Sequence, residues 1–216
     1  DPLSIGYLTG VWIKPYERLF AFYIRTDGKH IFFLNNLFVI PDIDVTKVWM
    51  SDTDDCIGIV ASHVDAGSDM GIDKSWPARF LLDLMERNPG VRYVNSSACV
   101  DQVRSIKDEY EKEKMRESSR INDACMEKAA AFVKEGMTEK ECADYIRSLY
   151  KEEGCEEGFE TIISFGANAA DPHHEPDDTV LKAGDCIVID MGCRKDGYCS
   201  DMTRTFFCRK EDPEYA

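Results

Sequence analysis

The stretch VIDMGCRKDGYCSDMTRTFF, Val188 to Phe207, places runs rich in β-branched and aromatic residues on either side of a turn. This pattern predicts two antiparallel strands that carry Asp190 and Asp201. If residues 194–197 form a four-residue loop, the two aspartates lie directly opposite each other on one face, with Cβ atoms about 5 Å apart. A two-residue loop at Asp196-Gly197 would offset the pair by two residues. The geometry of the pair therefore depends on the length of the loop.

Two like charges on paired strands need a partner. Opposed carboxylates are unfavourable neighbours, and the apolar residues before Asp190 predict a buried strand, in which the repulsion is stronger. A divalent cation such as manganese or magnesium would remove it, because carboxylate oxygens are good ligands for hard ions. The alternative is that one aspartate faces solvent while the other shares a proton or pairs with Arg204. The spacing leaves both interpretations open.

A second polar segment, SFGANAADPHHEPDD at residues 164–178, contains His173 and His174. A predicted strand leads here into turn-forming Gly, Asn and Pro residues, so both histidines are expected on a loop. Imidazole beside a metal-bound water or a polarised carbonyl is the usual proton carrier at neutral pH. A loop histidine can equally be an exposed residue with no catalytic role. His30 and His63, in the first half, are interpreted as structural or surface residues.

Composition excludes several kinds of partner. The 216 residues are 44% hydrophobic, enough for one large domain or two modest ones. The 26 basic residues against 41 acidic ones give a formal charge of −15, which argues against nucleic acid or an anionic membrane surface. No apolar run approaches the roughly 18 residues of a membrane span. The nine cysteines include no CxxC pair, so reduced thiols in a cytoplasmic protein are expected.

The first half is expected to form an α/β layer domain. Two strand-like runs flank Asp27-Gly28, which predicts a hairpin over residues 19–34. A helix follows within residues 73–90, with Ser75 as its predicted cap and Pro77 in its first turn. A strand over residues 91–95 comes next, and the domain is expected to end near residue 98.

The second half is expected to pack two helices on a common sheet. The charged segment at residues 101–136 has apolar residues at helical spacing and a glycine, Gly136, placed to end the helix. Thr138 and Glu141 form a capping-box pattern at the start of a second helix. The predicted strands lie in residues 159–165, 186–190 and 198–207.

The polar segments carry a resemblance. DMGCRKDGYCSDMTRTFF resembles the paired-aspartate signature of the Xaa-Pro peptidases, aminopeptidase P and prolidase, in the pita-bread metallopeptidase family. FGANAADPHHEP is similar to the Gly-x-Asn-x-x-x-x-x-His segment of that family. IGYLTGVWIKPYERLFAFYI, GIDKSWPARF and VRSIKDEYEKEKMRESSRI resemble its N-terminal domain and linker helix. Separated motifs in the family's order and spacing make the resemblance specific, and it covers essentially the whole chain.

The resemblance implies an α/β (α+β) fold with three parts. These are a creatinase/prolidase-like N-terminal domain at residues 1–98, a linker helix region at 99–114 and the first half of a pita-bread catalytic domain at 115–216. The family completes its site with a histidine and two glutamates well beyond the second aspartate, whereas only Glu211 and Glu214 follow here. The chain is therefore interpreted as an internal segment that has little or no activity alone.

The resemblance also implies a role for each matching residue. Asp190 would be a terminal ligand of one metal ion, and Asp201 would bridge two divalent ions, manganese first and cobalt or zinc as alternatives. His173 would approach the substrate and help stabilise the tetrahedral intermediate, with His174 as a neighbour outside the catalysis. Thr203 would support the bridging aspartate.

The implied reaction is metal-assisted hydrolysis of the peptide bond preceding proline, by a dipeptidase or an aminopeptidase that acts on proline-containing peptides as a homodimer. Two alternatives share the fold. One is a metal-free amidinohydrolase of the creatinase type, for which a retained pair of aspartates has no use. The other is a non-catalytic binding module, for which the acidic charge would suit a basic partner.

Overall fold

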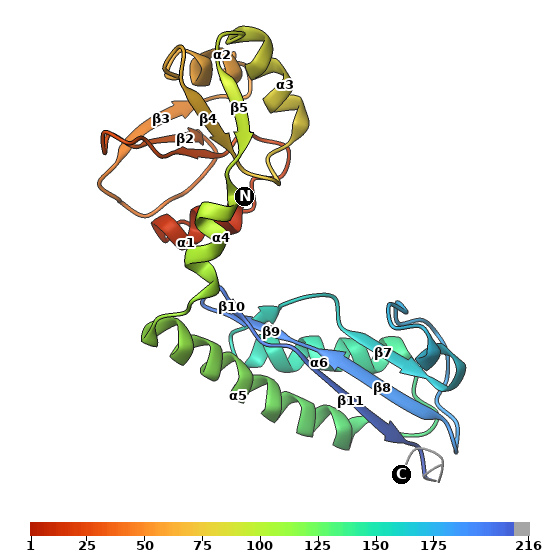
Figure 1. Cartoon of the computed structure of the whole chain (residues 1–216). Helices are drawn as coiled ribbons and strands as arrows, with labels where there is room; N and C mark the ends of the chain where they lie inside the picture. Colours follow the sequence, from red (N-terminus) through yellow and green to blue (C-terminus); the bar gives the residue numbers. More distant parts are fainter. Residues whose placement is uncertain (210–216) are drawn as a thin grey trace. The chain divides into compact units, whose positions relative to one another are not determined.

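The chain folds as two compact units, Asp1–Ile106 and Lys107–Ala216, in a computed structural model that describes residues 1–209 (Figure 1). Glu211 and Glu214 lie outside the described residues. The narrower domain limits expected from the sequence, at residues 98 and 115, stay a prediction. Within residues 1–209, no helix combines the length and the hydropathy that a membrane crossing requires.

The first unit is built around a hairpin. Strands β1 (Ala21–Tyr23) and β2 (Ile31–Asn35) pair antiparallel across the turn that contains Gly28, whose φ of 79° suits a glycine. The hairpin expected at Asp27-Gly28 is thus confirmed. Strand β3 (Thr46–Met50) joins β2 in parallel. Phe32 and Phe33, which point to opposite faces of β2, are both fully buried, so apolar side chains cover this strand on both sides.

The remaining elements of the first unit form a second small sheet and four helices. They are α1 (Pro2–Thr9), α2 (Cys56–Ala61), β4 (Asp69–Ile72), α3 (Ala78–Arg87), β5 (Arg92–Asn95) and α4 (Ser97–Ser105), with β4 parallel to β5. The predicted cap of α3 is wrong. Ser75 donates its hydroxyl to Asp73 at 2.9 Å, and Pro77 holds the N-cap position without a side-chain hydrogen bond.

The second unit has two main helices, each started by a capping box. Helix α5 (Glu109–Phe132) begins after Asp108, and helix α6 (Glu139–Glu152) begins after Thr138, as its capping-box pattern predicts. The charged segment at residues 101–136 is not one helix: α4 ends at Ser105, and α5 ends at Phe132 rather than at Gly136. Gly136 instead donates its backbone N–H to Leu181 O at 2.9 Å.

Strands β7 (Ile162–Phe165), β8 (Cys186–Met191) and β11 (Met202–Phe207) form an antiparallel sheet in the order β11-β8-β7. A smaller sheet continues it, with β10 (Tyr198–Cys199), β9 (Cys193–Lys195) and β6 (Glu156–Glu157). Ile189 of β8 is fully buried and joins a core cluster with Cys125 of α5 and Ile146 of α6. The prediction of two helices on a common sheet is confirmed (Figure 1).

A buried polar chain fixes the end of β8 to both helices. The Tyr150 hydroxyl of α6 donates to Asn122 Oδ1 of α5 at 2.6 Å, and Asn122 Nδ2 donates to Met191 O at 3.1 Å. All three residues have exposed fractions of 1% or less. Because each polar atom has a partner, these two hydrogen bonds fix the position of β8 without leaving a buried group unsatisfied.

The loop at the tip of the β9–β10 hairpin has two residues, not four. Lys195 pairs with Tyr198 across Asp196 and Gly197, whose φ angles of 51° and 87° suit the turn that matches strand twist. The same register continues into β8 and β11, where Asp190 faces Thr203. Direct opposition of Asp190 and Asp201 is therefore wrong, and the offset of two residues is the arrangement found.

Gly192, between β8 and β9, sits where the chain passes very close to itself. A Cβ atom there would lie 2.1 Å from Ser200 O and 2.6 Å from Phe159 Cε1. The carbonyl of Gly192 also accepts the Gly158 N–H at 2.8 Å. A glycine is thus required beside the segment that carries Asp201.

The substitution Gly192→Ala is expected to lower the free energy of unfolding by about 1 to 3 kcal/mol, because backbone has to shift to admit the methyl group. Urea unfolding followed by circular dichroism measures the loss. Gly90→Ala is the control, since no heavy atom lies within 4 Å of its added Cβ. Equal midpoints for the two variants would contradict the packing argument.

Two core thiols should be unreactive in the folded chain. Burial raises the pKa of Cys125 and of Cys142 to about 11, so only about one thiol in a thousand is ionised at pH 8. Exposed Cys99 should react with iodoacetamide first, as followed by mass spectrometry of labelled peptides. Rapid labelling of Cys125 before unfolding would show that this core opens readily.

Candidate functional site

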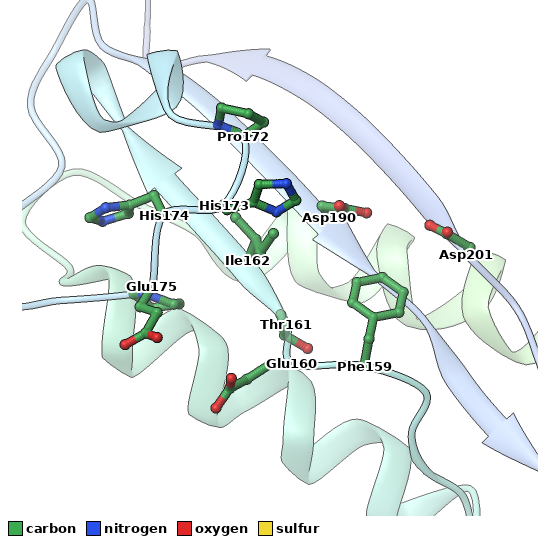
Figure 2. Close-up of a pocket in the computed structure, with 11 residues that line it drawn as sticks. Phe159, Glu160, Thr161, Ile162, Pro172, His173, His174, Glu175, Asp190 and Asp201 are labelled. Atoms are coloured by element: carbon green, nitrogen blue, oxygen red, sulfur yellow. The ribbon is translucent and has the colours of Figure 1, made fainter. Parts of the chain in front are cut away.

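A pocket of about 420 Å³ lies in the second unit and brings the two predicted polar segments together (Figure 2). Asp190 and Asp201 line it from the β8 and β11 side, and His173 and Pro172 line it from the loop after the 3-10 helix η1 (Gly166–Ala170). Residues 159–162, which lead into β7, complete its wall. The sequence segments around residues 173, 190 and 201 thus share one site.

The two aspartates occupy one face of the sheet as a diagonal pair. Asp190 lies opposite Thr203, and Asp201 precedes Thr203 by two residues, which returns it to the same face. Diagonal neighbours are typically about 7 to 8 Å apart, compared with about 5 Å for directly opposed residues. The buried environment predicted for the pair is found only in part, because Asp190 is half-buried and Asp201 is exposed.

The resemblance implies that Thr203 supports Asp201, but in the structure Thr203 lies opposite Asp190 and contacts that residue instead. Its hydroxyl donates to Asp190 Oδ1 at 2.9 Å, which orients that carboxylate. The guanidinium Nη1 of Arg204 donates to the carbonyl oxygen of Thr203 at 2.8 Å. Arg204 pairs across the sheet with Ile189, so both side chains lie on the face away from the aspartates. Its position does not favour the alternative in which Arg204 neutralises one of the pair.

The donor atoms present here suit a hard divalent ion. Asp190 and Asp201 offer carboxylate oxygens to one pocket from one sheet face, and the bond from Thr203 leaves Asp190 Oδ2 available as a ligand. A threonine that orients a carboxylate in this way is a common support for a metal ligand. The donor atoms of Asp190 and Asp201 are therefore compatible with the divalent-ion site that the resemblance implies.

His173 and His174 point to opposite sides of their loop. Figure 2 shows the ring of His173 directed towards Asp190, and its backbone N–H donates to Asp171 Oδ1 at 3.0 Å. His174 turns away and places Nε2 2.7 Å from Glu139 Oε2. The exposed His173 can therefore reach a molecule in the pocket, whereas the mostly buried His174 is held within the protein.

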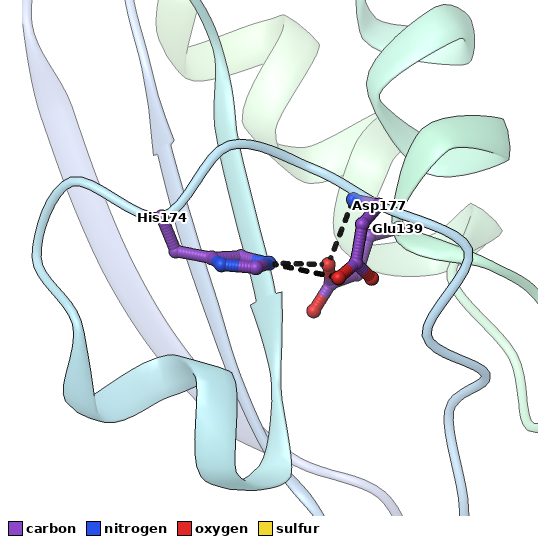
Figure 3. A group of neighbouring side chains, drawn as sticks. All are labelled: Glu139, His174 and Asp177. Atoms are coloured by element: carbon purple, nitrogen blue, oxygen red, sulfur yellow. Dashed lines mark hydrogen bonds and ion pairs between the residues drawn. The ribbon is translucent and has the colours of Figure 1, made fainter.

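Glu139, His174 and Asp177 form a second cluster of possible ligands, with the relevant atoms within 4.8 Å of one another (Figure 3). The sequence interpretation missed Glu139, the first residue of helix α6. Hydrogen bonds from the Thr179 hydroxyl and backbone N–H lower the pKa of Asp177 and occupy its carboxylate. The contacts of Glu139, described below, account for the cluster without a cation.

Two family models match this chain, and their limits agree with the two units of the structure. Residues 1–106 match the creatinase/prolidase N-terminal domain, and residues 113–216 match metallopeptidase family M24. An uncharacterised peptidase of Staphylococcus aureus (strain bovine RF122 / ET3-1) is 33% identical over 94% of this chain and 59% of its own length.

Solved structures give the same relationship. A dipeptidase from Pyrococcus horikoshii OT3 is 28% identical, with a TM-score of 0.85 over 98% of this chain and 60% of its own. A recombinant prolidase from Thermococcus sibiricus is 27% identical, with a TM-score of 0.88 over 97% of this chain and 60% of its own. The chain thus spans about 60% of the length of these relatives. It combines a creatinase/prolidase N-terminal domain with part of a metallopeptidase family M24 domain.

Proposed function

We propose that the full-length protein is a metal-dependent peptidase that hydrolyses the peptide bond preceding proline, as a dipeptidase or an aminopeptidase. The observation that carries the proposal is the pocket in which Asp190, Asp201 and His173 meet. Two of these residues come from a hairpin and one from a loop nearly 20 positions upstream. Their convergence on one solvent-accessible pocket supports a shared chemical task.

In this proposal Asp190 and Asp201 would be the residues of this chain that hold a pair of divalent ions. Manganese is the first candidate, and cobalt or zinc are alternatives. The bound ions would supply an activated water and Lewis-acid polarisation of the peptide carbonyl. Thr203 keeps the Asp190 carboxylate oriented through its 2.9 Å hydrogen bond. His173 donates a hydrogen bond to the carbonyl oxygen of the substrate as negative charge develops on it.

The proposal requires further ligands in the full-length protein. Two carboxylates supply too few donor atoms for two ions, and the relatives extend well beyond the length matched here. Activity, binding of proline-containing peptides and assembly as a homodimer are therefore proposed for the full-length protein, and the 216-residue chain alone is expected to be inactive.

The substitution Asp201→Asn in the full-length protein is expected to abolish metal-dependent cleavage of Xaa-Pro dipeptides and to leave the circular dichroism spectrum unchanged. An amide cannot hold the divalent ions as a carboxylate does. The matched control is Asp196→Asn on the same hairpin, because Asp196 pairs with Lys114 outside the pocket. Near wild-type turnover in the Asp201 variant would overturn the assignment.

The substitution His173→Ala should lower kcat by about 100-fold, the typical cost of losing one donor to the developing oxyanion. Bound metal should stay at the wild-type level, because the proposal makes His173 a donor to substrate rather than a ligand. Steady-state kinetics and metal analysis of the same samples separate the two roles. Loss of metal together with activity would make His173 a ligand instead.

A further inference from the structure

Glu139 is a fully buried acidic residue. Its exposed fraction is 0%, although it opens helix α6, where first-turn carboxylates are usually solvated. A buried carboxylate is costly unless hydrogen bonds satisfy its oxygens. The position of Glu139 at the N-terminus of the helix favours the anion only in part, so its other contacts have to account for its burial.

Four donors converge on this carboxylate. Oε1 accepts the Phe165 N–H at 2.7 Å and Asn168 Nδ2 at 3.0 Å. Oε2 lies 2.7 Å from His174 Nε2 and accepts the Asp177 N–H at 3.0 Å. Each oxygen therefore has two partners, which uses the acceptor capacity of the group. A cation at Glu139, His174 and Asp177 would have to displace these bonds, so we reject this cluster as a metal site.

The four donors are spread along one continuous segment. Phe165 ends β7, Asn168 lies in η1, and His174 and Asp177 lie in the loop that follows. One side chain of α6 thus binds the beginning, the middle and the end of the segment that carries His173. We name this segment, residues 165–177, the histidine loop.

The bond to His174 determines where His173 points. Pro172 and His173 form a turn, which the His174 N–H closes by donating to Asp171 O at 3.3 Å. Figures 2 and 3 show His173 facing Asp190 while His174 faces Glu139. His173 itself is exposed, and its backbone N–H contact is with Asp171 of the same loop. The hydrogen bond between His174 and Glu139 therefore ties the residue next to His173 to helix α6.

We propose that Glu139 is a positioning residue, which holds the histidine loop on helix α6 so that His173 faces the aspartate pair. Its effect on turnover rests on the proposed function, because it assigns His173 a task on the substrate. Its effect on the loop is a separate property of the fold. The two can be measured independently.

The test is Glu139→Gln in the full-length protein. Glutamine has nearly the same shape but offers one acceptor oxygen, so its amide nitrogen faces two donors that lose their partner. Hydrogen exchange by mass spectrometry should become at least about 10-fold faster in peptides that cover residues 165–177. The matched control is Glu141→Gln, two residues along the same helix, where the carboxylate accepts the backbone N–H and the hydroxyl of Thr138 in the capping box. Its histidine loop should exchange as in wild type.

Steady-state kinetics of single and double variants test whether Glu139 acts through His173. In Glu139→Gln, kcat for a Xaa-Pro dipeptide should fall by about 10- to 100-fold, the scale expected for a displaced functional group, with bound metal unchanged. In a His173→Ala background the same substitution should cause no further loss, because the residue that it positions is already gone. An equal loss in both backgrounds, or a loss of metal, would overturn the proposal.

A second variant covers the case in which Glu139→Gln does not fold. His174→Phe keeps a ring of similar size and removes one donor while the other three remain, so it should accelerate exchange of the histidine loop to a smaller degree. Unchanged exchange in both variants would refute the positioning role. Faster exchange with no Xaa-Pro cleavage by the wild-type protein would support the anchor and reject the proposed function.

Discussion

The pairing of β8 with β11 is the constraint on which the site depends. Within six residues β8 presents Ile187, Ile189 and Met191 to the helices and Asp190 to the pocket, since alternate residues of a strand face opposite sides. A slip of one residue would bury the aspartate and expose the core face. The buried chain from Tyr150 through Asn122 to Met191 O prevents such a slip. Core packing and site geometry are therefore set by the same register.

The diagonal offset of Asp190 and Asp201 changes the electrostatics of the pair. Directly opposed carboxylates on a buried strand would repel strongly, whereas here one is half-buried, the other is exposed, and Thr203 donates to the first. The offset and the exposure of Asp201 to solvent therefore weaken the repulsion between the two carboxylates. Close passage of Gly192 against Ser200 places Asp201 at the edge of the pocket.

Helix α6 serves the site from the opposite side. Its apolar face packs in the core through Cys142, Ile146 and Leu149. Its first residue, Glu139, accepts hydrogen bonds from the histidine loop. Phe165 places its side chain in the core, and polar contacts of Asn168, His174 and Asp177 hold the rest of the loop to the helix. A single saturated carboxylate can do this because Glu139 itself is fully buried, and hydrogen bonds are stronger where water is excluded.

Local chemistry in the sequence determined the hairpin at Asp27-Gly28, the capping box of Thr138 and Glu141, and the strand that carries Asp190, because each depends on neighbouring residues. The strand predicted over residues 198–207 is interrupted, and Asp201 lies between β10 and β11. The sequence also indicated the segments of His173, Asp190 and Asp201. Only the tertiary structure decided the two-residue turn, since both loop lengths satisfy the same turn residues. Glu139 likewise has no local signal, because its four partners lie 26 to 38 residues away and meet it only once β7 has packed on α6.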